Sequence, residues 1–111
     1  MPRDRLLLVE MIDAAERIND LVARRDAAGF EADRDARDAL LWNYTVLGEA
    51  ASKVSAELKG AHPEVPWSDP VRLRNRIVHG YWSIELDVLT STAAQDLPGL
   101  VAALRRMTEA E

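Results

Sequence analysis

Apolar residues recur every three or four positions along most of this 111-residue chain, and this spacing limits its fold more than any other feature. Side chains at such intervals share one face of an α-helix. The most regular run predicts a helix from about Asp35 to Leu58, packed against a long antiparallel partner within the chain or across a dimer. Its apolar positions are Leu40, Tyr44, Leu47, Ala51, Val54 and Leu58. We expect Tyr44 and Trp42 to be packing residues.

A similar stripe near the beginning of the chain predicts a helix from Arg3 to about Arg25, with Gly29 as its stop. Beyond this helix, charges of both signs mix with alanine as far as Asp38. Such a mixture is typical of a solvated turn, so we expect this segment to lead into the next helix without contributing to the core.

The segment from Lys59 to Trp67 contains one glycine and two prolines and is therefore predicted to be a loop. We expect Trp67 to anchor this loop on the core. His62 has no metal-ligand residue at suitable spacing and is interpreted as an ordinary surface histidine. Asp69 and Pro70 then predict the start of a third helix, because Asp caps a helix and Pro suits its first turn.

This third helix is predicted to end at His79, with Gly80 as the left-handed residue after it. A further helix is expected to begin near Ser83, whose hydroxyl can cap it. Because Pro98 interrupts the apolar stripe of that helix, we expect a kink or break near Asp96. The stripe consists of Leu86, Leu89, Ala93, Leu97, Leu100, Leu104 and Met107.

The sequence shows no strand pattern and no internal repeat. We therefore expect an all-α antiparallel bundle of four to five helices, forming one domain over residues 1–111. Cysteine is absent, which excludes disulfides and thiolate metal sites. No apolar run approaches the roughly 20 residues that span a bilayer. Acidic residues at Asp4 and Glu10 interrupt any signal-peptide pattern, so the expected location is cytoplasmic.

The segment from Val71 to Trp82 concentrates positive charge on an acidic protein. It contains three arginines, one of the chain's two histidines, two aromatic residues and no acid, whereas the whole chain has a net charge of −5. The overall charge argues against extended non-specific nucleic-acid binding, because counterion release requires many cations on one surface. The segment predicts a local site for a phosphate-bearing partner.

Arginine beside histidine is the minimum set for metal-free RNA cleavage, since histidine moves protons and arginine stabilises charge on phosphorus. One histidine cannot easily be acid and base at once, so a second His79 from a two-fold partner is attractive. A structural alternative stays open, in which the arginines pair with the abundant acids and His79 simply ends its helix. Glu49 is also open: it is either a buried acid with a role or an exposed or capping acid.

Four blocks of sequence occur in the order typical of one known family. They are Gly48-Glu49-Ala50-Ala51, Pro63-Glu64-Val65-Pro66-Trp67, Arg74-Asn75-Arg76-Ile77-Val78-His79-Gly80-Tyr81, and Asp96-Leu97-Pro98. The third block matches an R-x4-H-x-Y signature. On these blocks the chain resembles the HEPN superfamily and is most similar to its HepT-like toxins, over nearly the whole chain.

The resemblance implies an all-helical homodimer whose facing motifs build one ribonuclease site that needs neither metal nor cofactor. Arg74 and His79 would be the catalytic pair, and Asn75 would orient the substrate or the histidine. Arg72 and Arg76 are additional cations that we assign to contacts with the RNA backbone.

The resemblance also implies a partner, a minimal nucleotidyltransferase antitoxin that silences the toxin by transferring AMP to Tyr81. The added charge and bulk would block RNA in a basic cleft. Two other classes of function stay open: a non-catalytic module that binds a nucleotide or a nucleotidyltransferase, and a purely structural dimerisation module. The sequence does not indicate whether the RNA is tRNA or mRNA, or where it is cut.

Overall fold

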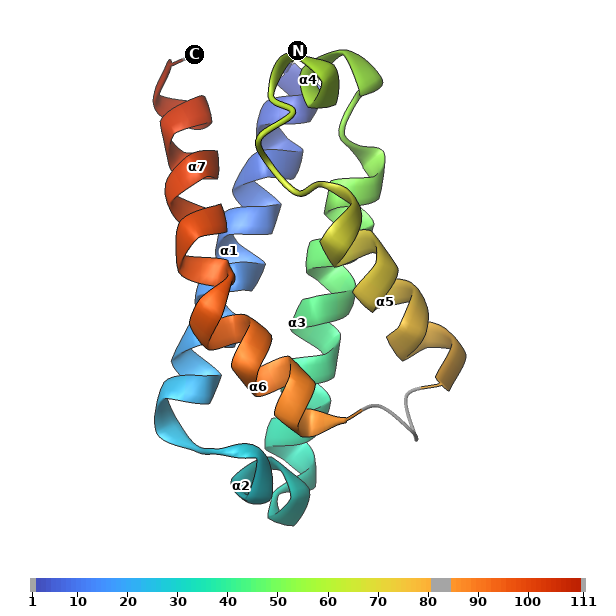
Figure 1. The fold of residues 1–111 in the computed structure, drawn as a ribbon, viewed down its shortest axis with the longest axis vertical. Coiled ribbons are helices and arrows are strands. Elements are labelled where there is room, and N and C mark those ends of the chain that lie inside the picture. Colours follow the sequence, from blue (N-terminus) through green and yellow to red (C-terminus); the bar gives the residue numbers. More distant parts are fainter. Residues whose placement is uncertain (1, 81–84, 111) are drawn as a thin grey trace.

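The computed structural model describes residues 2–80 and 85–110. This part of the chain forms seven helices and no strand, in the order α1 (Pro2–Arg24), α2 (Ala27–Ala32), α3 (Arg34–Lys53), α4 (Ala56–Ala61), α5 (Ser68–Gly80), α6 (Leu86–Gln95) and α7 (Leu97–Ala110) (Figure 1). The all-α prediction is confirmed. The number of helices exceeds the predicted four to five because α2 and α4 are short additional helices of six residues each.

Helices α1 and α3 form the centre of an elongated bundle and run in opposite directions (Figure 1). Helix α7 packs on α1, and α6 continues into α7 while contacting α1. Helix α5 packs on α3, and α2 closes one end by contacting α3 and α6. None of the helices in the described part of the chain has the length and apolar character needed to cross a membrane.

The apolar run predicted for the second long helix, called the seam below, forms the core-facing side of α3. Leu40, Tyr44, Leu47, Ala51 and Val54 are buried, and Leu58 is partly buried against the same core. The helix nevertheless ends at Lys53, before the predicted Leu58. Val54 is extended, and the Ser55 hydroxyl accepts a hydrogen bond from the backbone N–H of Leu58 at 3.1 Å, which starts α4. A capping serine therefore divides the apolar stripe between two helices.

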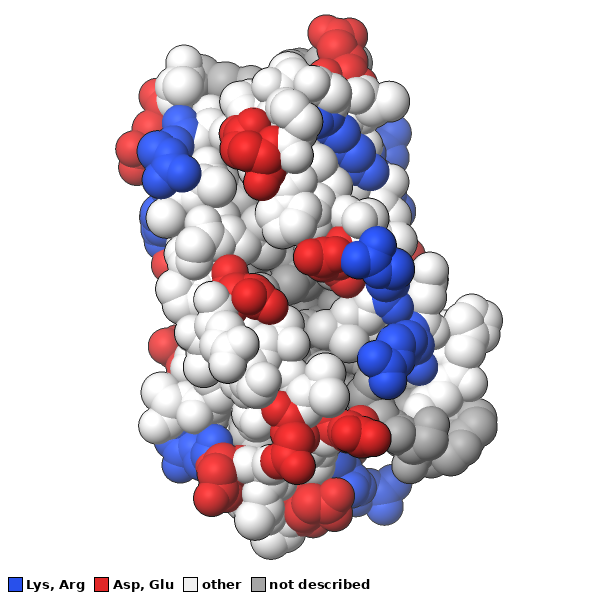
Figure 2. All heavy atoms as spheres, viewed as in Figure 1, with Lys and Arg blue, Asp and Glu red and all other residues white. Residues whose placement is uncertain are grey.

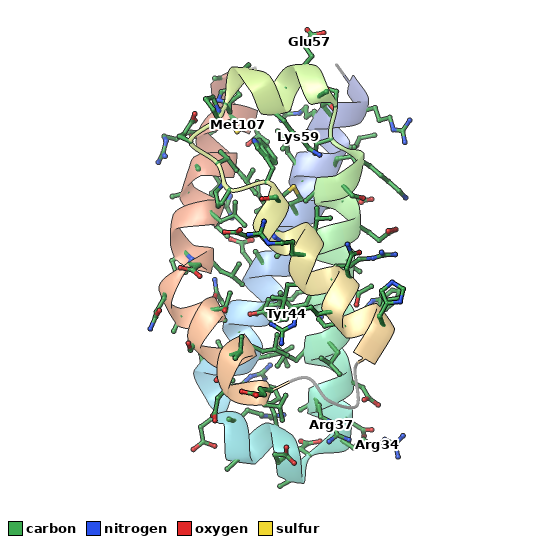
Figure 3. All side chains as sticks on the ribbon, turned by 45° about the vertical axis from the view of Figure 1, so that its right-hand side comes forward. Arg34, Arg37, Tyr44, Glu57, Lys59 and Met107 are labelled. Atoms are coloured by element: carbon green, nitrogen blue, oxygen red, sulfur yellow. The ribbon has the colours of Figure 1, made fainter. Side chains whose placement is uncertain are left out.

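Tyr44 is confirmed as a packing residue. Its ring lies among the helices at mid-height of the bundle (Figure 3), and its hydroxyl donates to the carbonyl oxygen of Leu89 on α6 at 2.6 Å. Burial raises the pKa of Tyr44 above its usual value. The same expectation for Trp42 is wrong, because 66% of this residue is exposed on the outer side of α3.

The apolar stripe near the end of the chain is confirmed at every position, since all seven of its residues are buried. The expected interruption falls where Pro98 predicts it. Helix α6 ends at Gln95, Asp96 lies between the helices, and α7 begins at Leu97. The break lets the two helices cover α1 at different angles (Figure 1).

The charged segment before Asp38 contributes to the core, contrary to the prediction of a solvated turn. Asp26 caps α2 by accepting a hydrogen bond from the backbone N–H of Gly29 at 2.9 Å, so Gly29 lies inside a helix. The prediction that Gly29 stops the first helix is wrong, since α1 ends at Arg24. Phe30 on α2 is completely buried.

Trp67 anchors its loop as expected: it is buried, and its indole N–H donates to the His62 carbonyl at 3.0 Å. Helix α5 begins at Ser68, so Asp69 lies in its first turn and contacts the Arg72 side chain instead of capping the helix. Gly80 belongs to α5 and has no positive φ, which corrects the predicted left-handed position.

The predicted cap Ser83 lies outside the described residues. The next helix, α6, starts at Leu86, somewhat later than expected, and the side chain of Glu85 at its N-cap position makes no capping hydrogen bond.

Candidate functional site

Helix α5 carries the basic segment as an amphipathic helix. Pro70 and Ile77 are buried, and Leu73 is partly buried against the core. Because these residues hold one side of the helix against the bundle, the polar side chains project from the other side. The exposed members of this set are Arg72, Asn75, Arg76 and His79.

Arg74 occupies a different environment from the other two arginines. Its guanidinium Nη2 lies 3.1 Å from Glu49 Oε1 on α3, and its Nη1 donates to Asn75 Oδ1 at 2.9 Å. Only 29% of the Arg74 side chain is exposed. The structure thus brings Arg74 and Asn75 together and adds Glu49, which the sequence left open between several roles.

His79 lies in the last turn of α5 and is exposed. It lies five positions after Arg74, which corresponds to about 140° around a helix and roughly 7.5 Å along it. No hydrogen bond or ion pair joins the two side chains, and the His79 side chain has none with any other residue in the described part of the chain. Its imidazole is therefore open to solvent, to a substrate or to a second protein.

The three residues assigned to substrate contact line one surface hollow of about 480 Å³ between α5 and α6. Figure 2 shows arginines over α5 on this face beside acidic side chains. Arg72 is engaged there, since it contacts Asp69 and donates to the Ser68 hydroxyl at 3.0 Å. Arg76 forms no ion pair with the residues that the structure describes. The hollow is lined by Asp69, Arg72, Leu73, Asn75, Arg76, Thr92 and Asp96.

A neighbouring cavity of about 460 Å³ has a mainly apolar floor and extends from this hollow toward α7. Tyr44, Leu47 and Leu100 contribute to the floor, while Asp69 and Asp96 are shared with the hollow. The two spaces together separate α5 from the α6–α7 side of the bundle. Arg72, Asn75 and Arg76 therefore border an open groove, whereas Arg74 and His79 are not among the residues that line it.

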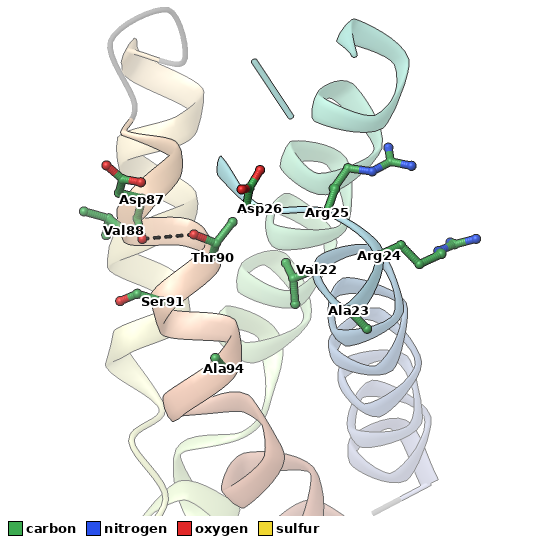
Figure 4. Close-up of a pocket in the computed structure, with 10 residues that line it drawn as sticks. All are labelled: Val22, Ala23, Arg24, Arg25, Asp26, Asp87, Val88, Thr90, Ser91 and Ala94. Atoms are coloured by element: carbon green, nitrogen blue, oxygen red, sulfur yellow. Dashed lines mark hydrogen bonds between the residues drawn. The ribbon is translucent and has the colours of Figure 1, made fainter. Parts of the chain in front are cut away.

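A third hollow, of about 840 Å³, lies between the end of α1 and α6 (Figure 4). Arg24 and Arg25 line it, but their guanidinium groups point away from α6. Arg25 pairs with Asp33 at 3.2 Å and lies 5.5 Å from the centre of the Phe30 ring. The hollow lacks convergent cations and does not resemble a phosphate site.

Two predicted residues remain to be placed. Tyr81 lies outside the described residues, and His62 is half-exposed with its Nδ1 3.4 Å from Glu64 Oε2. Within the described residues, no group of three or more His, Asp or Glu side chains is arranged to hold a metal ion.

An all-α bundle that displays Arg74 and His79 from one helix has the arrangement that the HEPN resemblance led us to expect. A family model described as "Ribonuclease HepT-like" matches residues 11–107, and the chain belongs to this family. The family resemblance predicted from the sequence blocks is confirmed.

Several curated proteins are similar to the chain over most of its length. A Thermococcus cleftensis protein named "Probable ribonuclease HepT" is 28% identical, over 84% of each chain. A candidate RNase of Methanocaldococcus jannaschii is 25% identical, over 82% of this chain and 84% of its own. Another from the same organism is 23% identical, over 85% of this chain and 78% of its own. No solved structure matches the chain.

Proposed function

We propose that this protein is a metal-independent endoribonuclease toxin, in which Arg74 and His79 form the catalytic pair of a homodimeric site. The observation that carries the proposal is the placement of these residues in a HepT-like chain. Arg74 is held at the contact between α3 and α5, while His79 is exposed at the end of the same helix. The substrate class is cellular RNA, either tRNA or mRNA, in the cytoplasm.

The chemistry is an attack of the ribose 2′-oxygen on the adjacent phosphorus with departure of the 5′-oxygen. A neutral His79 accepts the proton of the 2′-hydroxyl, and a protonated one donates a proton to the leaving oxygen. Arg74 stabilises the negative charge that develops on the phosphoryl oxygens. Because these steps require both protonation states together, we assign the second histidine to the partner subunit of a two-fold dimer.

Exposed apolar side chains beside the Arg74–Glu49 pair support this dimer. Trp42 is 66% exposed and lies seven residues, or two turns, before Glu49 on α3. Val78 is 47% exposed and lies one turn after Arg74 on α5. Since α3 and α5 run in opposite directions, both residues lie on the same side of the ion pair (Figure 1). Burial of such residues favours association.

We further propose that a nucleotidyltransferase antitoxin silences the enzyme by transferring AMP to Tyr81. The chain contains two tyrosines. Tyr44 is buried and its hydroxyl is engaged with Leu89, so it is a poor acceptor. Tyr81 directly follows α5 in the sequence, so AMP on this residue would add negative charge and bulk to the basic segment and compete with RNA.

Incubation of the purified protein with total cellular RNA and EDTA tests the catalytic proposal. We expect discrete cleavage by the wild type and by His62→Ala, and none by His79→Ala. The His62 variant is the matched control, because the chain has two histidines. Equal cleavage by His79→Ala and the wild type would refute the assignment. An inactive wild type, dimeric and unmodified by intact mass, would favour the non-catalytic binding module.

The AMP transfer is tested separately with a cognate nucleotidyltransferase and ATP. We expect Tyr44→Phe to gain the mass of AMP as the wild type does, and Tyr81→Phe to gain none. The Tyr81 variant should also stay active in the presence of the antitoxin. Modification of Tyr81→Phe to the wild-type level would contradict the assignment.

A further inference from the structure

Helices α3 and α5 approach each other closely at Gly48. A Cβ atom at this position would lie 2.2 Å from Arg74 Cβ and 2.6 Å from the Pro70 carbonyl oxygen. Neither distance is sterically possible, and one neighbour is backbone, so any side chain here would push α5 outward. The absence of a side chain at Gly48 thus fixes how closely Arg74 approaches α3.

The adjacent residue, Glu49, holds the far end of the same arginine. Consecutive helical residues differ by about 100° in direction, so Gly48 can face α5 while Glu49 stands at the edge of the contact. From this edge, Glu49 Oε1 lies 3.1 Å from Arg74 Nη2. The pair Gly48-Glu49 therefore makes room for the base of the Arg74 side chain and fixes its tip.

The use of the guanidinium donors follows from these contacts. Arginine has five N–H groups. One N–H of Nη1 donates to Asn75, Nη2 forms an ion pair with Glu49, and the Nε–H is buried without a hydrogen-bond partner. Each terminal nitrogen keeps at least one further N–H. Two donors in the plane of the guanidinium are thus left for an anion such as a phosphate.

We infer that Glu49 is a positioning residue that orients Arg74 toward the scissile phosphate. The inference rests on the proposed ribonuclease function and extends it to a residue on α3. A free arginine samples many rotamers, and a transition state is stabilised only by donors already held in place. Glu49 removes much of this freedom.

Exposure of the two side chains separates this role from a structural one. The Arg74 and Glu49 side chains are 29% and 41% exposed, and ion pairs accessible to water contribute little to stability. Loss of the carboxylate should consequently reduce cleavage much more than it reduces the melting temperature. A second possible effect, in which Glu49 competes with phosphate for Arg74, has the opposite sign, because removing the carboxylate would then strengthen RNA binding.

The kinetic test compares Glu49→Gln, Glu49→Ala and Arg74→Ala on one RNA substrate. We expect Glu49→Ala to lower kcat by roughly 10- to 100-fold with a small change in KM, as for a misplaced transition-state donor. Glu49→Gln should fall between Glu49→Ala and the wild type, because the amide oxygen still accepts a hydrogen bond. The double variant Glu49→Ala/Arg74→Ala should be no less active than Arg74→Ala alone, since both act through one guanidinium.

Glu16→Gln is the matched control. Glu16 also pairs with an arginine, Arg105, in a contact between α1 and α7 with 47% of its side chain exposed. This variant should cleave RNA as the wild type does. Wild-type or higher activity of Glu49→Ala, or additive losses in the double variant, would overturn the inference.

An NMR measurement tests the positioning independently of cleavage. We expect a resolved Nε–H resonance of Arg74 in the wild type, because the Nε atom is shielded from solvent. It should broaden or disappear in Glu49→Ala and persist in Glu16→Gln. Persistence in Glu49→Ala would show that Glu49 does not hold the arginine. If the resonance behaves as expected but the wild type does not cleave RNA, the proposed function fails and the positioning stands.

Discussion

The carboxylate of Asp4, near the start of α1, accepts two hydrogen bonds from Ser55, one from the backbone N–H at 2.9 Å and one from the hydroxyl at 2.6 Å. Ser55 is also the N-cap of α4, so a single buried acid ties the first helix to the junction of α3 and α4. The side-chain and backbone hydrogen bonds from Ser55 hold the pKa of Asp4 below its usual value.

Asp4→Asn should destabilise the fold at neutral pH by roughly 1–2 kcal/mol, as for hydrogen bonds to a charged group. Because the folded pKa of Asp4 is lowered, this stabilisation is present above the unfolded pKa and is lost as pH falls through the folded value. Urea unfolding at pH 7 and at about pH 3 should therefore show a difference between variant and wild type that shrinks in acid. Glu10→Gln on the exposed side of α1 should show none, and a pH-independent difference for Asp4→Asn would contradict the linkage.

Spacing rules predicted the parts of the fold that depend on long apolar stripes. The seam of α3 and the stripe shared by α6 and α7 are buried as expected, and Pro98 marks the break between these helices. The predicted end of α3 was wrong because Val54 continues the apolar periodicity although its backbone is extended. Periodicity describes which side of the chain is apolar, whereas the Ser55 cap decides where the helix stops.

Residues whose role depends on a distant neighbour could not be assigned from the sequence. Trp42 and Tyr44 are close in sequence, yet among the described residues Tyr44 has a hydrogen-bond partner, the carbonyl of Leu89, whereas Trp42 is exposed. Likewise, Glu49 is one of 19 acidic residues, and its contact with Arg74 depends on how closely α3 and α5 pack. Gly48 was the available signal, since a glycine inside a helix often marks a close approach.

Phe30→Ala should destabilise the protein by about 3–5 kcal/mol, the usual cost of removing a buried phenylalanine. Phe30 is completely buried although its helix, α2, is short and lies in a charged segment. The ring fills the end of the bundle where α2 contacts α3 and α6. Chemical denaturation measures the loss, and the exposed neighbour Glu31→Ala is the control. A change below about 1 kcal/mol would show that α2 is not part of the cooperative core.

Arg76→Ala should weaken RNA binding more than Arg72→Ala. Arg72 already contacts Asp69 and Ser68, whereas Arg76 has no ion pair within the described residues and lines the same hollow. A free cation gains more from a phosphate than one that must leave an acid. Binding to a single-stranded RNA as a function of salt measures this, and each lost phosphate contact should reduce the slope by about 0.7. Equal RNA affinities of the two variants would contradict the predicted order.

Trp42→Glu should convert the proposed dimer to a monomer without unfolding the chain. Trp42 is 66% exposed on α3, so the monomer loses little packing, while a charge in a subunit interface is costly. Leu6→Glu is a matched control, because Leu6 is 68% exposed on α1, away from the contact of α3 with α5. Light scattering coupled to size exclusion gives the mass of each variant. Dissociation by Leu6→Glu and not by Trp42→Glu would place the interface elsewhere. If Trp42→Glu is monomeric and folded, we also expect it to lose RNA cleavage. This loss would indicate that the site requires His79 from both subunits.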